Sequence, residues 1–280
     1  MNINGKNYLI EGDRIAFLDS RFYHDKSTGS FVPSTMTIIN GAYPKGAQFY
    51  EWVKKHGEDA DEVRDEAGRR GSTVHTLTEL YDQGEVIALM NPDGTPRYKI
   101  IEWAMFERYT EFCTEFPGKL HAIELNMASS ALGWGGTLDR VMTLDIDGIT
   151  RIIDIKTGGG VWPGYWLQQA AYHQLLFHTG AASDILGADT KPEDVRLSIL
   201  WLGAKTRGPR KGAIQGKGWQ LIDQEESTEH YLDLFRKTRS LWLAENAGMM
   251  PREINYKLQH QRKVGALGWE EHKTDITVKQ

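Results

Sequence analysis

Two carboxylates and one amine lie on a pair of apolar segments that read as neighbouring β-strands. The segment TRIIDIKT carries Asp154 and Lys156 two residues apart, and the preceding segment GTLDRV carries Asp139. Because side chains alternate along a strand, Asp154 and Lys156 should share one face, about 6–7 Å apart. The Asp-Gly turn signal in DIDG lies between the two segments and predicts an antiparallel hairpin that places Asp139 beside Asp154.

Two carboxylates this close repel each other unless a proton or a cation lies between them. Hard oxygen ligands with open coordination positions suit Mg²⁺ or Mn²⁺. A lysine beside such an ion can orient a water molecule or stabilise negative charge. The pattern therefore predicts a divalent-metal site at Asp139 and Asp154. The structural alternative is a salt-bridged hairpin in which Asp154 pairs with Lys156 or Arg140.

Two expected helices carry polar pairs spaced by one helical turn. His75 and Glu79 lie beside an apolar stripe in GSTVHTLTELYDQG, and Gln168 and Tyr172 lie on the packing face of YWLQQAAYHQLLF. Each pair also has a structural explanation, as a boundary histidine with a carboxylate partner and as a tyrosine at the rim of an amphipathic helix. Polar groups at the edge of a packing face need partners, so both pairs are candidates for the site.

Basic side chains gather in the glycine-rich segment GAKTRGPRKGAIQGKG, which contains no acid. A basic loop beside an acidic metal site suits contacts with a phosphate backbone, although a solvated loop is the simpler explanation. Two arginines before the histidine helix are further candidates. The candidate DNA-binding residues are Arg69, Arg70, Lys205, Arg207, Arg210, Lys211 and Lys217.

The pattern of apolar residues and turn signals alternates between helices and strands along the chain. Helices are expected over residues 47–57, 61–82, 101–116, 163–179 and 225–246. Strands are expected over residues 8–12, 14–19, 31–40, 120–127, 136–147, 150–157, 195–203 and 218–223. This order predicts an α/β (mixed α+β) fold in which helices flank one central mixed β-sheet.

Composition is that of an ordinary globular protein, with 40% hydrophobic and 25% charged residues and a formal net charge of −5. We expect one domain over residues 1–250 with a β-rich N-terminal segment to about residue 45, followed by a C-terminal arm over residues 251–280 that is terminal or partly disordered. The start of the chain has no signal-peptide pattern, and no segment is apolar enough to cross a membrane. The single cysteine, Cys113, fits a reducing cytoplasm.

The chain carries, in this order, GSTVH with Glu79, GTLDR, DIKTG and the Gln168/Tyr172 pair. Together these motifs resemble the PD-(D/E)XK nuclease superfamily, and most closely its RecB-like and phage-exonuclease branch. VPSTMTII followed by FYEWVKK is also similar to the N-terminal segment of phage members. The resemblance covers about residues 33–179. It implies a restriction-endonuclease-like core and a metal-dependent DNA exonuclease of phage or bacterial recombination or repair.

The resemblance also implies roles for individual residues. Asp139, Asp154, the Ile155 carbonyl oxygen and His75 would hold Mg²⁺ or Mn²⁺, and Lys156 would position or activate the attacking water. The branch members that carry an iron–sulfur cluster need several cysteines, so no such cluster is expected here.

The remaining motif residues have less defined implied roles. Gln168 and Tyr172 would contact the DNA backbone or order the site, and Glu79 and Glu124 would assist the metal or only hold structure. DNA is the implied partner, together with a strand-annealing or single-strand-binding protein.

Other functions remain open or are excluded by the same residues. A structure- or sequence-specific endonuclease of the same fold and a DNA-binding module without activity are the alternatives. The TGGG segment lacks the Gly-Lys-Ser/Thr ending of a nucleotide-binding loop, which argues against an NTPase or a dinucleotide-binding enzyme.

Overall fold

The computed structural model describes residues 21–206 and 208–251 in full; outside these ranges it describes the backbone of short strands and of Ser20. Those strands are β1 (Asn2–Ile3), β2 (Lys6–Asn7), β3 (Ile10–Glu11), β4 (Arg14–Phe17), β13 (Gln261–Gly265) and β14 (Gly268–His272). Arg207 and most of the expected arm over residues 251–280 therefore lie outside the described residues.

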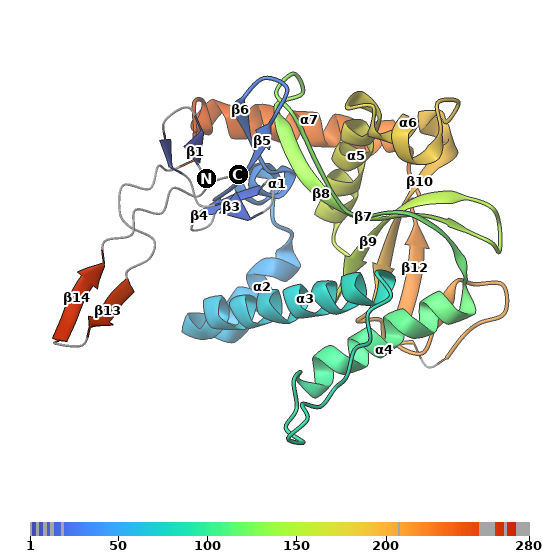
Figure 1. Ribbon diagram of the computed structural model, residues 1–280. Coiled ribbons are helices and arrows are strands. Elements are labelled where there is room, and N and C mark those ends of the chain that lie inside the picture. Colours follow the sequence, from blue (N-terminus) through green and yellow to red (C-terminus); the bar gives the residue numbers. More distant parts are fainter. Residues whose placement is uncertain are drawn as a thin grey trace.

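A six-stranded mixed sheet forms the centre of the molecule (Figure 1). Its strand order is β11-β12-β10-β9-β8-β7. The strands are β7 (Gly118–Ser129), β8 (Trp134–Leu144), β9 (Thr150–Lys156), β10 (Val195–Trp201), β11 (Gln215–Gly216) and β12 (Trp219–Asp223). Strands β7, β8 and β9 pair antiparallel in chain order, and β9 pairs parallel with β10. The predicted hairpin between residues 136–147 and 150–157 is confirmed.

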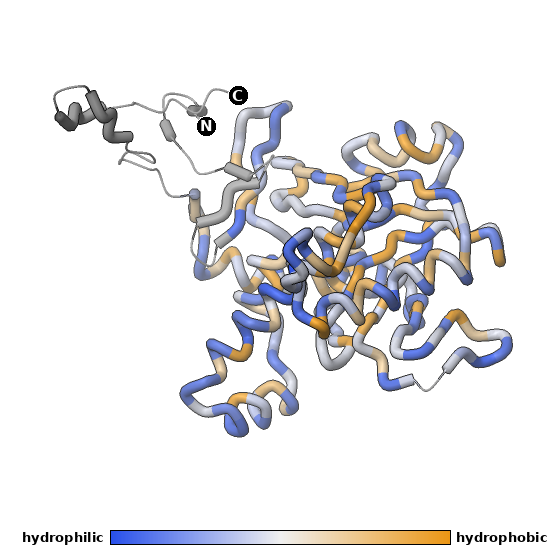
Figure 2. The backbone as a smooth tube through the Cα atoms, turned by 60° about the horizontal axis from the view of Figure 1, so that its bottom comes forward, coloured by the Kyte–Doolittle hydropathy of each residue, from blue (hydrophilic) through white to orange (hydrophobic). Residues whose placement is uncertain are grey.

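Helices cover both faces of this sheet, which confirms the predicted α/β class (Figure 1). Ile152 packs with α1 (Thr35–Ala42), α5 (Pro163–His178) and α7 (Thr228–Asn246), whereas the next residue, Ile153, packs with α3 (Ala60–Asp82) and α4 (Ile100–Glu115). Because neighbouring residues of a strand point to opposite faces, the two helix groups lie on opposite sides. The tube in Figure 2 is mostly orange through this centre and mostly blue along the outer turns.

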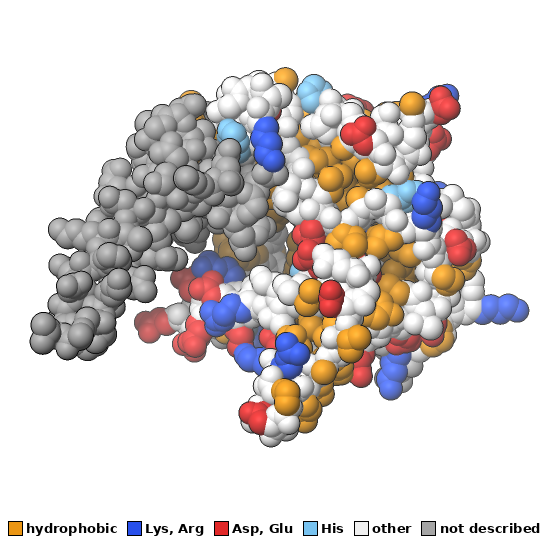
Figure 3. All heavy atoms as spheres, viewed as in Figure 1, with side chains coloured by type: hydrophobic (Ala, Val, Ile, Leu, Met, Phe, Trp, Pro, Cys, Tyr) orange, Lys and Arg blue, Asp and Glu red, His pale blue; other side chains and the backbone are white. Residues whose placement is uncertain are grey.

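Shorter elements complete the described part of the chain. They are β5 (Ser20–Asp25), α2 (Ala47–His56), α6 (Ala181–Leu186) and the 3₁₀ turns η1 (Gly57–Asp59) and η2 (Pro192–Asp194). Within the described residues, no helix combines the length and the apolar character that crossing a membrane requires. In the view of Figure 3, Lys and Arg side chains alternate with Asp and Glu and do not form one continuous basic surface.

The strand expected over residues 31–40 is wrong in its second half. Strand β6 (Ser30–Pro33) ends at Pro33, and α1 begins at Thr35. The Ser34 hydroxyl accepts a hydrogen bond from the Thr37 amide at 2.9 Å and caps the helix. Ile38 and Ile39 are then buried against α7 and α5, so tertiary packing outweighs the strand preference of their β-branched side chains.

The buried guanidinium of Arg151 holds one end of the sheet together. Arg151 is 1% exposed and donates to Asp223 on β12 and to Asp147 in the β8–β9 turn, at 2.6–3.1 Å. Hydrogen bonds from Arg151 lower the pKa of Asp147. Burial alone would raise the pKa of Asp223, but hydrogen bonds from Arg151, Ser198 and Arg196 outweigh it and lower that pKa. The network thus ties together three segments that are distant in sequence.

Replacing Arg151 with Met should reduce the free energy of unfolding by about 3 kcal/mol at neutral pH, because two carboxylates lose a buried partner. Both carboxylates have a pKa that is lowered by folding, so this stabilisation is fully present above the unfolded-state pKa of about 3.9 and is lost as pH falls through the folded-state values. Urea unfolding of the wild-type protein and the variant at pH 7, 5 and 3.5 should show a gap that narrows only at the lowest pH. The exposed ion pair of Arg236 with Glu229 provides the control, since Arg236→Met should cost well under 1 kcal/mol. Equal losses in the free energy of unfolding for the two variants would contradict the stabilising role of the buried Arg151.

Candidate metal and catalytic site

The β8–β9 hairpin brings Asp139 and Asp154 to the same end of the sheet. The paired register runs as far as Arg140 opposite Ile153, so Asp139 and Asp154 are the next residues on the two strands. Beyond this pair, the Asp139 side chain takes the place of a backbone acceptor, because its Oδ2 accepts a hydrogen bond from the Ile155 amide at 2.8 Å. Both aspartates are buried, with exposures of 8% and 2%.

Glu124 reaches this position through an unusual backbone conformation. It has φ = 46° and is the only non-glycine residue with positive φ among the described residues. On β7 it lies between Ile123, which pairs with Arg140, and Leu125, which pairs with Leu138. A left-handed conformation costs a side-chain-bearing residue roughly 1–3 kcal/mol and is typical of functional sites.

His75 enters from α3 and completes a cluster of possible metal ligands. Its Nδ1 lies 3.5 Å from Asp139 Oδ2 and 3.8 Å from Glu124 Oε1, and its Nε2 lies 3.0 Å from the Ile155 carbonyl oxygen. One ligand atom each from His75, Glu124 and Asp139 fall within 4.8 Å of one another. Burial alone would lower the pKa of His75, but the carboxylates of Asp139 and Glu124 outweigh it and raise the pKa.

Asp154 lies next to this cluster and faces α5 through Lys156 and Gln168. Lys156 Nζ lies 2.6 Å from Asp154 Oδ2, and Gln168 joins the pair by donating to Asp154 Oδ1 at 3.3 Å and accepting from Lys156 Nζ at 3.2 Å. Burial raises the pKa of Asp154; Lys156 opposes this shift, and the charge on Asp139 adds to it. The ion pair that the structural alternative requires is therefore present, and the ammonium serves as the counter-charge of Asp154.

The side of α5 that faces the site carries Tyr165, Gln168 and Tyr172, which are spaced by three and four residues. The Tyr172 hydroxyl is buried and accepts a hydrogen bond from Gln168 Nε2 at 3.1 Å. The ring of Tyr172 occupies the space that a Cβ at Gly136 would need. The Tyr165 ring centroid lies 4.5 Å from Lys156 Nζ. Tyr165 was not predicted as a site residue from the sequence, although its three-residue spacing from Gln168 indicates the same face of the helix.

Arg140 supports the cluster from the α3–α4 side of the sheet. Its guanidinium is 1% exposed, pairs with Asp82 and Glu124, and donates to Thr78 at 3.2 Å. Tyr109 on α4 donates to the same Asp82 carboxylate at 2.6 Å. Sequence reasoning treated Arg140 only as a possible partner of Asp154, whereas the structure assigns it to Asp82 and Glu124. Arg140 therefore links the strained Glu124 to two helices.

The other residues singled out from the sequence lie outside this cluster. Glu79 accepts a hydrogen bond from Gln83 at 3.1 Å and is absent from the group of possible metal ligands. Arg69 is exposed, and Arg70 is half-buried five residues before His75.

The described part of the basic loop is exposed at Lys205, Arg210, Lys211 and Lys217. The loop starts directly at the site, because the Leu202 amide donates to the Lys156 carbonyl oxygen at 2.8 Å. The Trp201 indole donates to the Gly158 carbonyl oxygen at the same distance.

The donor set fits a divalent cation. Asp154 Oδ2 is buried and lies 2.6 Å from Lys156 Nζ, so the carboxylate keeps lone pairs that a cation could use. Three carboxylates, a backbone carbonyl oxygen and one imidazole form the kind of oxygen-rich set that suits Mg²⁺ or Mn²⁺.

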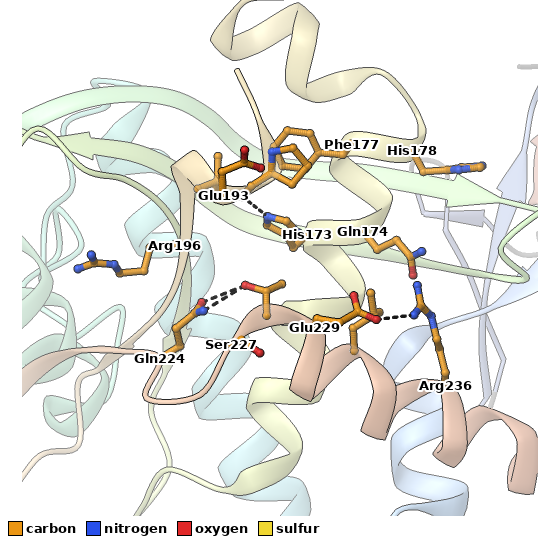
Figure 4. Close-up of a pocket in the computed structure, with 14 residues that line it drawn as sticks. His173, Gln174, Phe177, His178, Glu193, Arg196, Gln224, Ser227, Glu229 and Arg236 are labelled. Carbon is orange, nitrogen blue, oxygen red and sulfur yellow. Dashed lines mark hydrogen bonds and ion pairs between the residues drawn. The ribbon is translucent and has the colours of Figure 1, made fainter. Parts of the chain in front are cut away.

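A separate cavity of about 780 Å³ lies between α5, α7 and the start of β10 (Figure 4). Both arginines that line it are paired with carboxylates: Arg236 with Glu229 at 2.9 Å, and Arg196 with Asp223, which lies outside the lining, at 2.7 Å. Val195 lies at this cavity and Trp201 lies beside Lys156, so the cavity and the site are roughly 20 Å apart along β10. The cavity is thus distinct from the acidic cluster.

Comparison with known proteins adds little to this geometry. No family model matches the chain. A curated protein described as "Bifunctional protein ThiO/ThiG", from Nostoc sp. (strain PCC 7120 / SAG 25.82 / UTEX 2576), is 29% identical to it over 98 residues. This match covers 29% of the chain and 15% of that protein. A similarity of this extent does not place the chain in a family, so the site itself carries the functional argument.

Proposed function

We propose that this protein is a Mg²⁺- or Mn²⁺-dependent deoxyribonuclease that hydrolyses phosphodiester bonds from DNA ends. The observation that carries the proposal is the convergence of His75, Glu124 and Asp139 beside the Asp154–Lys156 pair. These residues come from α3, β7, β8 and β9, so the fold gathers them from four elements. The expected exonuclease activity in phage or bacterial DNA recombination or repair follows from the motif resemblance.

His75, Glu124, Asp139 and Asp154 would hold the cation, together with the Ile155 carbonyl oxygen. A divalent ion in such a site supplies Lewis-acid stabilisation of the negative charge that develops on a phosphate. Burial alone would lower the pKa of Lys156, but Asp154 and Asp139 outweigh it and raise the pKa. Lys156 therefore acts as a charged donor that orients water and stabilises negative charge.

The DNA backbone would pass beside the start of the basic loop. The loop directly follows Leu202, whose amide hydrogen-bonds to the Lys156 carbonyl oxygen, and its exposed cations lie within the sixteen residues after Leu202. Backbone contacts of this type need no base recognition, which agrees with digestion from an end without sequence preference.

One observation favours a second function. The 2.6 Å contact between Lys156 and Asp154 is also what a purely structural ion pair would form, so the fold could serve as a DNA-binding module without activity. An endonuclease of the same fold is the third possibility. Both alternatives are separated from the proposed exonuclease by the experiment below.

Purified protein incubated with Mg²⁺ or Mn²⁺ should degrade linear duplex DNA and leave covalently closed circular DNA intact, and EDTA should stop the reaction. An endonuclease would nick or cut the circle. A module without activity would retard both DNAs in a gel and cleave neither, which would overturn the proposal.

The variant Asp139→Asn is the specific control for this activity. It should lower the cleavage rate at least about 100-fold and weaken Mn²⁺ binding measured by calorimetry, because it removes a charge from the ligand set. The exposed Asp145, in the turn after β8, offers the matched change, and Asp145→Asn should leave both quantities unchanged. Wild-type turnover in Asp139→Asn would remove that carboxylate from the mechanism.

Gly136→Ala should impair catalysis without touching a charged group. The added methyl would overlap the Tyr172 ring, and the displaced ring would move Gln168 away from Asp154 and Lys156. We expect a loss of about 1–3 kcal/mol in the free energy of unfolding and a lower kcat at temperatures where the variant is folded. Gly68 on α3 has open space around its Cβ position, so Gly68→Ala should keep wild-type kcat. An unaltered kcat in Gly136→Ala would mean that the position of the Tyr172 ring does not affect catalysis.

Neutralising the basic loop tests the path of the DNA. The triple variant Lys205→Gln, Arg210→Gln and Lys211→Gln should raise KM and reduce the slope of log K against log salt concentration by up to about 2–3, since each lost phosphate contact contributes about 0.9. DNA affinity measured from 50 to 300 mM salt gives this slope. An unchanged slope would mean that the loop does not touch phosphate.

A further inference from the structure

Lys156 is held by three partners of different kinds: a carboxylate, an amide oxygen and an aromatic ring. Its ammonium contacts Asp154 Oδ2 at 2.6 Å, Gln168 Oε1 at 3.2 Å and the face of the Tyr165 ring at 4.5 Å from the centroid. Tyr165 lies in the first turn of α5, where its amide donates to the Trp162 carbonyl oxygen at 3.0 Å. The backbone of Tyr165 is therefore fixed by the start of the helix.

The three contacts of Lys156 differ in how they respond to a cation. A divalent ion bound to the Asp154 carboxylate would share it with Lys156, so binding of the ion weakens the Asp154–Lys156 ion pair. The Tyr165 ring attracts the ammonium through its quadrupole and provides no oxygen that the cation needs. Gln168 also contacts Asp154, so its position depends on the same carboxylate.

We propose that Tyr165 is a positioning residue that holds the Lys156 ammonium at the catalytic site through its aromatic face. Within the described part of the chain, no hydrogen bond involves the Tyr165 hydroxyl, so the ring and not the hydroxyl carries the effect. The consequence for hydrolysis rests on the proposed function, whereas the placement of Lys156 does not.

Two substitutions separate the ring from the hydroxyl. Tyr165→Phe keeps the aromatic face and should keep kcat within about 3-fold of wild type, whereas Tyr165→Leu keeps an apolar side chain without the face and should lower kcat about 10-fold with little change in KM. Thermal unfolding shows whether each variant is folded at the assay temperature. A Leu variant with wild-type kcat, or a Phe variant as impaired as the Leu variant, would overturn the proposal.

A second measurement does not depend on catalysis. Brief acetylation of the native protein followed by mass spectrometry reports how accessible Lys156 is, with the exposed Lys205 as internal reference. Labelling of Lys156 should be several-fold faster in Tyr165→Leu than in wild type and Tyr165→Phe, and the difference should grow when Mn²⁺ is added. Tyr231, a half-buried tyrosine that stacks on Trp166, offers the matched control, because Tyr231→Leu should leave Lys156 labelling unchanged.

The two measurements distinguish a failure of this inference from a failure of the proposed function. If the wild-type protein does not cleave DNA but Lys156 labelling rises only in Tyr165→Leu, the nuclease proposal fails and the positioning role stands. If the wild-type protein cleaves DNA and labelling is equal in all variants, the positioning role fails alone.

Discussion

The electrostatic cost of burying several charges at one end of the sheet governs the arrangement of the site. Isolated buried carboxylates are unfavourable unless a cation or hydrogen-bond donors compensate them. Here Asp154 is compensated by Lys156 and Gln168, and Asp139 by the Ile155 amide. Lys156 and Ile155 lie on β9, Gln168 lies on α5 and Asp139 itself lies on β8, so these contacts form only when the three elements are assembled together.

The support around the site follows the same principle. Arg140 and Arg151, both 1% exposed, lie on neighbouring strands, and each is paired with a carboxylate from a distant segment, Asp82 and Asp223 respectively. Arg151 fixes β9 against β12 at the end away from the site, whereas Arg140 connects β8 to α3 and to Glu124. Removing one partner of such a pair leaves an uncompensated charge, which is why buried pairs of this kind hold segments in a fixed relation.

Local sequence signals predicted the hairpin and the α/β class because alternation, the Asp-Gly turn and helical spacing act over a few residues. The cluster itself was predicted less completely. His75 and Asp139 were named, but Glu124 had only an accessory role, because nothing in LHAIELNM indicates a residue with positive φ. Arg140 and Tyr165 were missed as supports because their partners lie on other elements, and the helix at Thr35 was missed because packing of Ile38 and Ile39 outweighs their strand preference. Packing and long-range ion pairs of this kind depend on the assembled fold.

The structural ion pair and the metal site explain different parts of this geometry. An ion pair between Asp154 and Lys156 needs nothing from Glu124, His75 or Asp139. Yet Glu124 adopts a left-handed conformation that costs free energy, and this conformation brings its carboxylate towards Asp139 and so adds electrostatic repulsion. His75 contacts both carboxylates and Arg140 pairs with Glu124, but the Arg140 guanidinium is shared with Asp82. A divalent cation would offset both the strain and the repulsion, and a salt-bridged hairpin would offset neither. The strained backbone of Glu124, which the Asp154–Lys156 ion pair does not explain, is the reason to prefer the catalytic interpretation over the structural one.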